Sequence, residues 1–361
     1  MQWIACLVFF CALGMSSAWA QQDIVRVRIK SGISKVFLSG LNLRLTGHEE
    51  KFSKVAIPQD RKMEISRVIV AGKTYWQISQ GASSITRDVM NSEEALLVQG
   101  ENLREEGLEL PNKILLREGT SGQIDIIGVV PMEEYVFSVL AQEMPLRWPI
   151  ETLKAQAIAI RSYTMAVLQE RKAKAFHVES SVLDQVYKKI SMNISPELIE
   201  KAHTAVKETE GVYLLNPKGR ILKAFYHSDC GGKTVPAGSV WKKESAMDAG
   251  VAVDAGCPVN PMARWSYKIS KEKFAAVSKD FLGDIRSNEF RQILGFMNLR
   301  STAFEMKDQE GEIEFVGKGF GHRVGMCQWG SRALGLKAYS HQRILKHYYP
   351  LASLKQFSDS N

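Results

Sequence analysis

The sequence predicts an α+β protein in which a β-rich N-terminal module precedes a domain of mixed helices and strands. Between Asp23 and about Leu110, short runs alternate branched apolar and polar residues, as in residues 24–29 and 67–70, which is typical of strands. Beyond residue 130, helical periods and strand-like runs follow one another without regular alternation, which excludes a doubly wound sheet. The predicted division is residues 21–110, residues 111–352 and a C-terminal tail of residues 353–361.

The first 20 residues predict export of the mature chain. This stretch is apolar and uncharged and ends in Ala18-Trp19-Ala20, a small-residue pattern typical of a secretory signal cleaved before Gln21. Cys11 raises the alternative of a lipoprotein anchor, but the bulky residues 8–10 before it favour a soluble periplasmic or extracellular protein. No later segment approaches the roughly 20 apolar residues that a membrane-spanning helix needs.

The net charge of the chain narrows the class of partner. The net charge of +8 belongs entirely to the mature chain and favours anionic partners such as cell-wall polymers, phospholipid head groups or nucleic acid. Nucleic acid is not expected, because the chain has no RNA-binding signature, zinc-finger spacing or phosphate-cradling loop.

After signal removal the cysteines are Cys230, Cys257 and Cys327. We expect a Cys230–Cys257 disulfide, with three buried thiols as the alternative.

Prolines mark the start of three predicted helices. A strand over residues 123–130 ends at Pro131, which begins a helix running toward Gln142 and places Glu143 at its end. Pro149 begins a second helix, on which Lys154 and Arg161 lie two turns apart and therefore share a face. We expect both basic side chains to point into one groove.

The remaining elements follow from capping and turn signals. Ser195 caps a third helix that has Pro196 in its first position and ends at Gly211. Residues 212–215 and 220–226, joined by Asn216-Pro217-Lys218-Gly219, predict a hairpin, and a final helix lies near residues 340–348.

Three motifs follow one another along the chain. The first is Glu134-Tyr135 followed by LAQEMPLRWPIETLKAQAIAIRSYT. The second is YHSDCGGKT with a later Val240-Trp241 and Cys257-Pro258. The third is GKGFGHRVGMCQWGSRALG with the helix of residues 344–350. In this order they resemble the motifs of the stage II sporulation protein D (SpoIID) family, whose members are peptidoglycan lytic transglycosylases or relatives described as amidase enhancers. The resemblance spans about residues 115–350 and implies a SpoIID-like catalytic domain with a glycan groove.

The chain departs from the family at three places. Some members bind zinc through a Cys and a His-Cys pair before Gln-Val-Tyr, but here Leu183 and Asp184 precede Gln185, so we expect no metal and no cofactor. His227 and Cys230 would form only half of a metal site, because no second pair with suitable spacing follows. Arg323 replaces a usual Gly and Ser331 a usual Ala, which bears on the local loop shape.

The resemblance implies that Glu143 is the catalytic acid. Glycoside cleavage needs a carboxylic acid that is still protonated near neutral pH, and hydrolysis normally needs a second carboxylate. A lytic transglycosylase needs only one, because the 6-hydroxyl of the muramic acid attacks in place of water. Glu151 is the only other carboxylate near Glu143 in sequence, and a helix-dipole role explains it. The competing interpretation of Glu143 is a solvated or capping acid.

Substrate contacts are expected from basic, polar and aromatic residues of the motifs: Lys154, Arg161, His227, Gly231, Gly232, His322, Gln328 and Trp329. An arginine fork suits the lactyl carboxylates that strands without stem peptides expose. Each residue has a structural alternative. Lys154 and Arg161 would lie on a solvated face or pair with Glu143, His227 would be a strand-end or metal-binding histidine, the glycines would permit close backbone approach, and Trp329 would belong to the core.

The expected function is therefore an exported lytic transglycosylase that cleaves MurNAc–GlcNAc strands, most favourably strands without stem peptides, using one glutamate. A non-catalytic glycan-binding protein that stimulates a cell-wall amidase is the main alternative, and a muramidase that uses water is the second.

Overall fold

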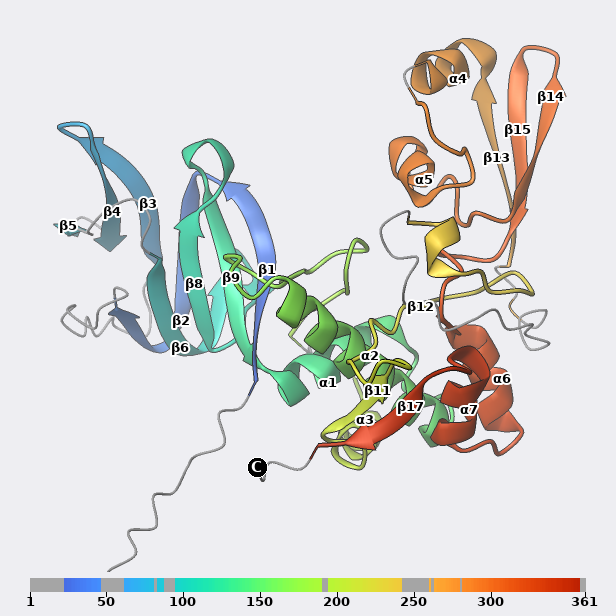
Figure 1. Ribbon diagram of the computed structural model, residues 1–361. Helices are drawn as coiled ribbons and strands as arrows, with labels where there is room; N and C mark the ends of the chain where they lie inside the picture. The colour runs from blue at the N-terminus through green and yellow to red at the C-terminus, as the bar shows by residue number, and fades with distance from the viewer. Residues whose placement is uncertain are drawn as a thin grey trace, which may run out of the picture.

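The computed structural model describes residues 23–46, 62–80, 83–87, 95–189, 194–241, 260, 263–279 and 281–357. The predicted signal segment and Cys257, and with it the expected Cys230–Cys257 bridge, lie outside these residues. Figure 1 shows a β-rich region at one side, helices in the centre and a small mixed lobe at the other side. The predicted α+β class is confirmed.

A large sheet forms the N-terminal region. Its strand order is β10-β1-β9-β8-β6-β2-β3-β4-β5, and β7 pairs with β6. The strands are β1 (Ile24–Ile33), β2 (Lys35–Thr46), β3 (Met63–Val70), β4 (Lys73–Gln80), β5 (Ser83–Arg87), β6 (Leu96–Glu105), β7 (Leu108–Glu109), β8 (Lys113–Glu118), β9 (Ile124–Pro131) and β10 (Val178–Glu179). Because β8 and β9 pair within it, this sheet continues past the expected boundary at residue 110 as far as Pro131.

Three helices follow the sheet: α1 (Met132–Glu143), α2 (Ile150–Glu170) and α3 (Pro196–Lys207). Pro131, Pro149 and Ser195 are their N-caps, so the starts predicted from prolines are confirmed. The third helix ends at Lys207 and a turn leads to Gly211, which is shorter than predicted. Within the described part of the chain, no helix has the length and apolarity needed to cross a bilayer.

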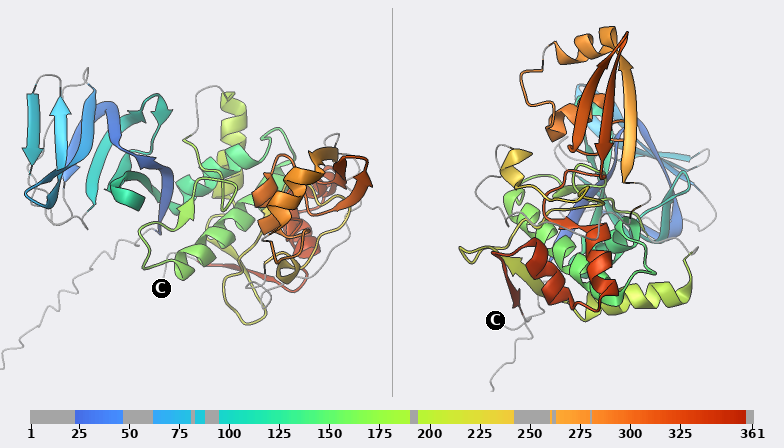
Figure 2. Two further views of the ribbon diagram at one scale, coloured as in Figure 1. Left: turned by 90° about the horizontal axis from the view of Figure 1, so that it is seen from above. Right: turned by 90° about the vertical axis from the view of Figure 1, so that its right-hand side faces the viewer.

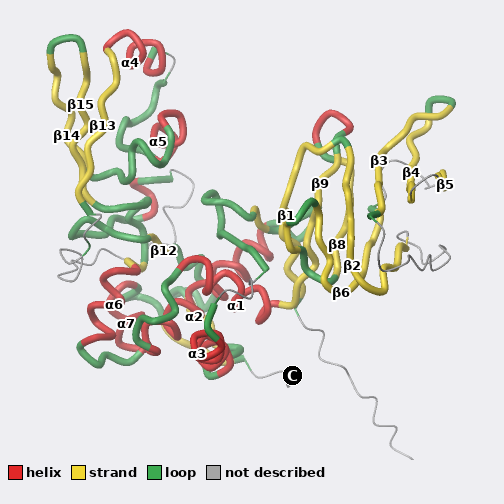
Figure 3. The backbone as a smooth tube through the Cα atoms, turned by 180° about the vertical axis from the view of Figure 1, so that it is seen from behind, coloured by secondary structure: helices red, strands yellow, loops and turns green. Residues whose placement is uncertain are grey.

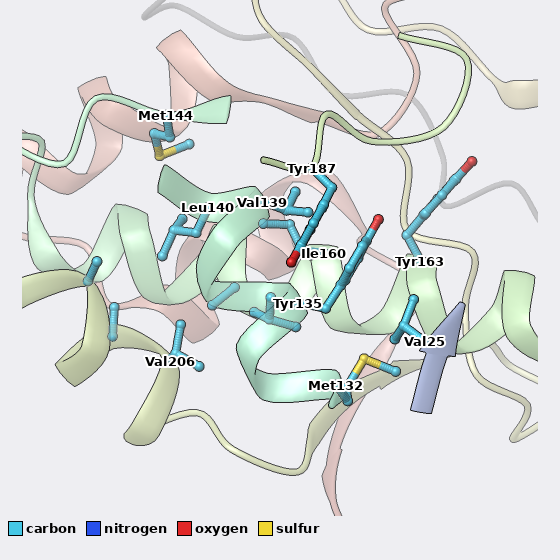
Figure 4. Packing of buried hydrophobic residues seen from close by; sticks show 14 of the residues in the cluster. Val25, Met132, Tyr135, Val139, Leu140, Met144, Ile160, Tyr163, Tyr187 and Val206 are labelled. Carbon is cyan, nitrogen blue, oxygen red and sulfur yellow. The ribbon is translucent and has the colours of Figure 1, made fainter. Parts of the chain in front are cut away.

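The helices pack against the sheet through one shared core. Val25 of β1 lies beside Met132 and Tyr135 of α1 and Ile160 of α2, as Figure 4 shows. The ring of Tyr187 stacks on Tyr135 with centroids 5.5 Å apart. The start of α1 is thereby anchored to β1, which gives the end of α1 a rigid support.

The C-terminal residues return to the helices instead of forming a free tail. β17 (Ser353–Gln356) pairs antiparallel with β11 (Val212–Leu215), so part of residues 353–361 is a strand. The predicted hairpin forms only as a turn, with Leu222 N–H donating to the Leu214 carbonyl (2.8 Å). β12 (Tyr226–His227) pairs instead with β16 (Met326–Cys327), ahead of α6 (Gln328–Leu336) and α7 (His341–Tyr348).

Between β12 and β16 the chain builds a lobe that had no sequence prediction. Its sheet has the order β13-β15-β14, formed by β13 (Arg264–Ser270), β14 (Phe304–Gln309) and β15 (Glu312–Lys318). Helices α4 (Lys271–Ser278) and α5 (Asn288–Leu294) cover a core centred on Phe290 and Phe315. Figures 2 and 3 show this lobe standing away from the N-terminal sheet. Short 3-10 turns lie at Thr120–Gly122 and Ala237–Ser239.

We expect Gly325→Ala to destabilise the protein strongly. Gly325 has φ +69°, and an added Cβ would overlap the Phe225 carbonyl oxygen at the β12–β16 junction. Strained backbone costs about 1–3 kcal/mol, and the clash adds to it. Gly219→Ala is the matched control, because Gly219 has φ +72° but open space around it. Urea unfolding should show the larger loss for Gly325→Ala, and equal losses would contradict the close packing of this junction.

Candidate active site

Glu143 is the last residue of α1 and has a single backbone contact. Its Oε1 accepts a hydrogen bond from Val186 N–H at 3.0 Å. Burial raises the pKa of Glu143, and the Val186 hydrogen bond opposes this effect more weakly. The residue still keeps part of its surface exposed. Burial therefore biases the carboxyl group toward the protonated form.

Polar and aromatic side chains surround Glu143 from segments distant in sequence. Tyr135 donates its hydroxyl proton to Gln185 Oε1 (3.0 Å), and the same oxygen accepts from the Thr164 hydroxyl (2.8 Å). Gln185 also lies near the phenol of Tyr226. Burial raises the pKa of Tyr226, and the nearby Glu143 charge raises it further. Sequence reasoning missed Gln185, Val186 and Tyr226, although Gln185-Val186-Tyr187 and the residue before His227 both lie in recognised motifs.

A cavity of about 1170 Å³ opens beside this cluster. Tyr226 belongs to its wall, together with Tyr163, Asp184, Trp241 and His322 among other residues. Tyr226 therefore connects the cavity to the surroundings of Glu143, which does not itself line the wall. The lobe contributes residues from Phe281 to Met297 to the opposite side.

Asp184 is a second carboxylate at the site. The sequence analysis did not predict it, because Asp184 is distant from Glu143 in the chain. It lies two residues before Val186 and is held by Arg171 Nη1 (2.7 Å) and by the Tyr163 hydroxyl (3.0 Å). The Glu179 N–H also donates to it (2.9 Å). These three donors hold Asp184 in place as a hydrogen-bond and ion-pair partner.

Lys154 and Arg161 share a face of α2, but acidic residues already occupy it. Lys154 Nζ pairs with Glu151 (2.9 Å) and Glu208 (2.6 Å). The Arg161 side chain is 0% exposed and binds both carboxylate oxygens of Glu133, at 2.7 and 2.6 Å. Neither basic residue is a cause of the pKa shift of Glu143. The structure thus places both side chains in ion pairs rather than in the cavity, and they do not lower the pKa of Glu143.

His227 and His322 come together, with ring centroids 5.5 Å apart. His322 lines the cavity beside Trp241, and its Nδ1 accepts the Val324 N–H (3.1 Å). Burial, followed by the His227 and Arg291 charges, holds the pKa of His322 well below its usual value. His227 is buried and its Nδ1 lies 3.0 Å from the Val324 carbonyl. Only His322 of this pair therefore faces a ligand-sized space.

The remaining predicted residues have structural surroundings. Gly231 has φ +66°, and an added Cβ would lie 2.9 Å from the Lys318 carbonyl oxygen; Gly232 follows with φ +108°. Gln328 is buried in the first turn of α6. Trp329 packs edge-on against Trp148, with centroids 5.2 Å apart. The packing of Trp329 on Trp148 agrees with the alternative that Trp329 belongs to the core. The turn at Gly231 and Gly232 brings the second motif close to Lys318 of the third motif.

We expect Glu143→Gln to become more stable than the wild type as pH rises. Glutamine keeps an oxygen for the Val186 N–H but cannot ionise. In the wild type the folded-state pKa is raised above the unfolded value near 4.5, so the folded protein loses stability as pH rises through the folded pKa. Urea unfolding between pH 4 and pH 8 measures the difference. Glu200→Gln, at an exposed position, should show no such trend, and a flat difference for Glu143→Gln would contradict the shifted pKa.

Fold and site together define an α+β protein in which Glu143, a carboxylic acid with a raised pKa, lies near Tyr226 in the wall of a cavity. The family model described as stage II sporulation protein (SpoIID) matches residues 120–215, which include Glu143, Gln185 and Val186. The chain belongs to the SpoIID family. This family is linked to the processing of the cell wall.

Three relatives show the extent of the similarity. An uncharacterised protein of Brachyspira hyodysenteriae is 31% identical over 251 residues, covering 62% of this chain and 66% of that protein. Stage II sporulation protein D of Bacillus amyloliquefaciens is 29% identical, covering 61% and 73% respectively. An amidase enhancer of Bacillus subtilis is 22% identical over 298 residues, covering 61% of this chain and 40% of that protein.

Proposed function

We propose that the chain is an exported lytic transglycosylase that cleaves peptidoglycan glycan strands with Glu143 as its only acid and base. One observation supports the proposal: burial raises the pKa of Glu143, a partly exposed residue, and the nearby Tyr226 connects its surroundings to a cavity of about 1170 Å³. A general acid must be protonated at working pH and within reach of the substrate, and a raised pKa is the direction that this role requires of Glu143.

The chemistry proceeds in two proton transfers at one residue. Glu143 first donates its proton to the glycosidic oxygen while the bond from C1 of the muramic acid to that oxygen breaks. The sugar then carries positive charge at C1, and the 6-hydroxyl of the same ring attacks this carbon. The Glu143 carboxylate takes the hydroxyl proton, which closes a 1,6-anhydro ring and restores the acid without consuming water.

A hydrolytic mechanism would need a second carboxylate free to activate water or to attack the sugar. Asp184, Asp284 and Glu289 are carboxylates of the cavity wall. Of these, Asp184 lies two residues before Val186, whose N–H binds Glu143, but Arg171, Tyr163 and the Glu179 N–H already bind it. The engagement of this carboxylate favours transglycosylation over the muramidase alternative.

Strands without stem peptides remain the proposed substrate, on different grounds from those expected. Lys154 and Arg161 are engaged with acids of α1, α2 and α3 and are not proposed as substrate contacts. Arg171 and Lys223 line the cavity, but each is also paired with an acid, Asp184 and Glu170 respectively. The proposal therefore rests on the net charge of +8, which favours a polymer that exposes lactyl carboxylates. His322 and Trp241, also in the wall, are the proposed sugar contacts.

A second candidate function rests on the similarity to the amidase enhancer of Bacillus subtilis. In this account the chain holds glycan strands in the cavity and stimulates a cell-wall amidase without cutting the strand. The cavity and its cations would serve equally, but the raised pKa of Glu143 would have no role. Export through the segment of residues 1–20 is part of both proposals.

Product analysis separates these functions. Purified strands without stem peptides are incubated with the mature chain and analysed by mass spectrometry. We expect new muramic acid ends in the anhydro form, each lighter than a reducing end by one water. Reducing ends would support the muramidase alternative. Strands that stay intact would support the enhancer alternative if, in a parallel reaction on peptidoglycan that still carries stem peptides, the chain makes an added amidase release these peptides faster.

A further inference from the structure

We propose that His227, Cys230 and Cys327 form a binding site for a thiophilic divalent cation, with Zn²⁺ as the best-matched ion. One ring nitrogen of His227 and the two Sγ atoms lie within 4.8 Å of one another, and all three residues are buried. This site is separate from the Leu183-Asp184 position where metal ligands are replaced. The expectation of no metal rested on ligands close in sequence, whereas Cys327 follows Cys230 by 97 residues.

Strand pairing brings the three ligands together. β12 and β16 are parallel neighbours, and in their register His227 lies opposite Cys327. Cys230 follows three residues after His227, and its N–H donates to Cys327 Sγ at 3.3 Å. The second and third motifs therefore meet at this point, each contributing sulfur and the second also contributing the imidazole.

The distances suit zinc after a small contraction. Zn²⁺ binds cysteine sulfur at about 2.3 Å and histidine nitrogen at about 2.0–2.1 Å in tetrahedral geometry, which places ligand atoms roughly 3.5–3.8 Å apart. A cluster that lies within 4.8 Å needs to close by only about 1 Å at its widest pair. Three ligands of these types leave the fourth position for water or another donor.

Neighbouring hydrogen bonds favour the metal-binding forms of Cys327 and His227. Cys327 caps α6, and its Sγ accepts N–H bonds from Cys230 (3.3 Å) and Gly330 (3.4 Å), both of which favour a thiolate. A protonated Cys327 has an alternative contact with the Ser228 carbonyl, at 3.8 Å. Since a carbonyl only accepts, the 3.0 Å contact of Val324 O fixes the proton of a neutral His227 ring on Nδ1, so that Nε2 would be the ligand atom.

A disulfide is the competing use of these cysteines. A bond between Cys230 and Cys327 would need their sulfurs about 2.05 Å apart and would leave the third converging ligand, His227, without a role. The sequence-based pairing of Cys230 with Cys257 would remove one ligand from the cluster. The convergence of an imidazole with two sulfurs favours the metal over either bridge.

The bound ion would tie β12 to the start of α6. Adjacent residues of a strand point to opposite faces, so fixing His227 also fixes Tyr226, whose phenol lies near Glu143. The inference is independent of the cleavage mechanism, because a metal would hold this strand in a catalytic protein and in a glycan-binding one alike.

The test uses the mature chain, purified under reducing conditions and loaded with Zn²⁺ or Co²⁺. We expect one equivalent of zinc to remain after dialysis, and the cobalt form to show the charge-transfer absorption of thiolate ligands. Cys230→Ser and Cys327→Ser should each weaken cobalt binding by more than about 100-fold, beyond the 10–100-fold typical of an outer-shell change. His322→Gln, a neighbouring imidazole outside the cluster, should retain the absorption.

Two results would overturn the proposal. One is a folded, reduced wild type that retains no zinc and shows no cobalt–thiolate band. The other is protein purified without reductant in which Cys230 resists alkylation because of a disulfide to Cys257 or Cys327, and which takes up no metal after reduction. The cobalt spectrum of the wild type reports the sulfur ligands directly, so the test stands even where a cysteine variant fails to fold.

Discussion

Glu143→Gln will leave the protein folded and lower its cleavage of glycan strands by about 10²–10⁴-fold, the usual contribution of a general acid. Glutamine matches the size of glutamate and still accepts the Val186 N–H, but it has no proton for the glycosidic oxygen. The rate of release of anhydro-ended fragments, followed by mass spectrometry, measures the effect.

Glu200→Gln provides the matched control for this variant. Glu200 is an exposed glutamate of α3, so the same chemical change there should keep the wild-type rate. Binding of strands to the cavity should persist in Glu143→Gln. Full cleavage by the Glu143→Gln protein would show that another group supplies the proton.

Arg161→Met will destabilise the protein by about 3 kcal/mol. Breaking a buried ion pair by removing one partner typically costs about 3–5 kcal/mol, and the lower end applies here because the Glu133 side chain remains 22% exposed. The substitution also removes donors from the Val206 and Val212 carbonyls. Urea unfolding at pH 7 measures the loss.

Two further variants separate structural support from substrate contact. Adding Glu133→Gln to Arg161→Met should recover part of the lost stability, because it removes the uncompensated carboxylate. Lys154→Met should cost about 1 kcal/mol or less, since its partner Glu208 is 52% exposed. An Arg161→Met protein of wild-type stability that no longer cleaves glycan would instead make Arg161 a substrate contact.

Local signals in the sequence were sufficient for the starts of α1, α2 and α3 and for the position of Glu143. Proline has a fixed φ and no N–H, so Pro131, Pro149 and Pro196 predicted helix starts that the structure confirms. Glu143 accordingly lies at the end of α1. The common face of Lys154 and Arg161 was also a correct consequence of helical geometry.

Contacts between segments that are distant in the chain could not be predicted from local sequence signals. The face shared by Lys154 and Arg161 was expected to be open, but packing of α1 and α3 brings Glu133 and Glu208 onto it. The Val186 N–H that binds Glu143 lies 43 residues away, and no spacing rule predicts it. For the same reason, the sequence did not predict that Asp184 lies at the site. Nor did it predict that Cys327 lies opposite His227, which follows from the pairing of β12 with β16.

Cleavage in ¹⁸O-labelled water tests the central claim most directly. The mature chain is incubated with strands without stem peptides, and the new ends are analysed at once by mass spectrometry. Cleavage by Glu143 alone, with the 6-hydroxyl as nucleophile, predicts anhydro ends that carry no ¹⁸O. New reducing ends that carry ¹⁸O would contradict it, because the oxygen would have come from a water activated by a second catalytic group.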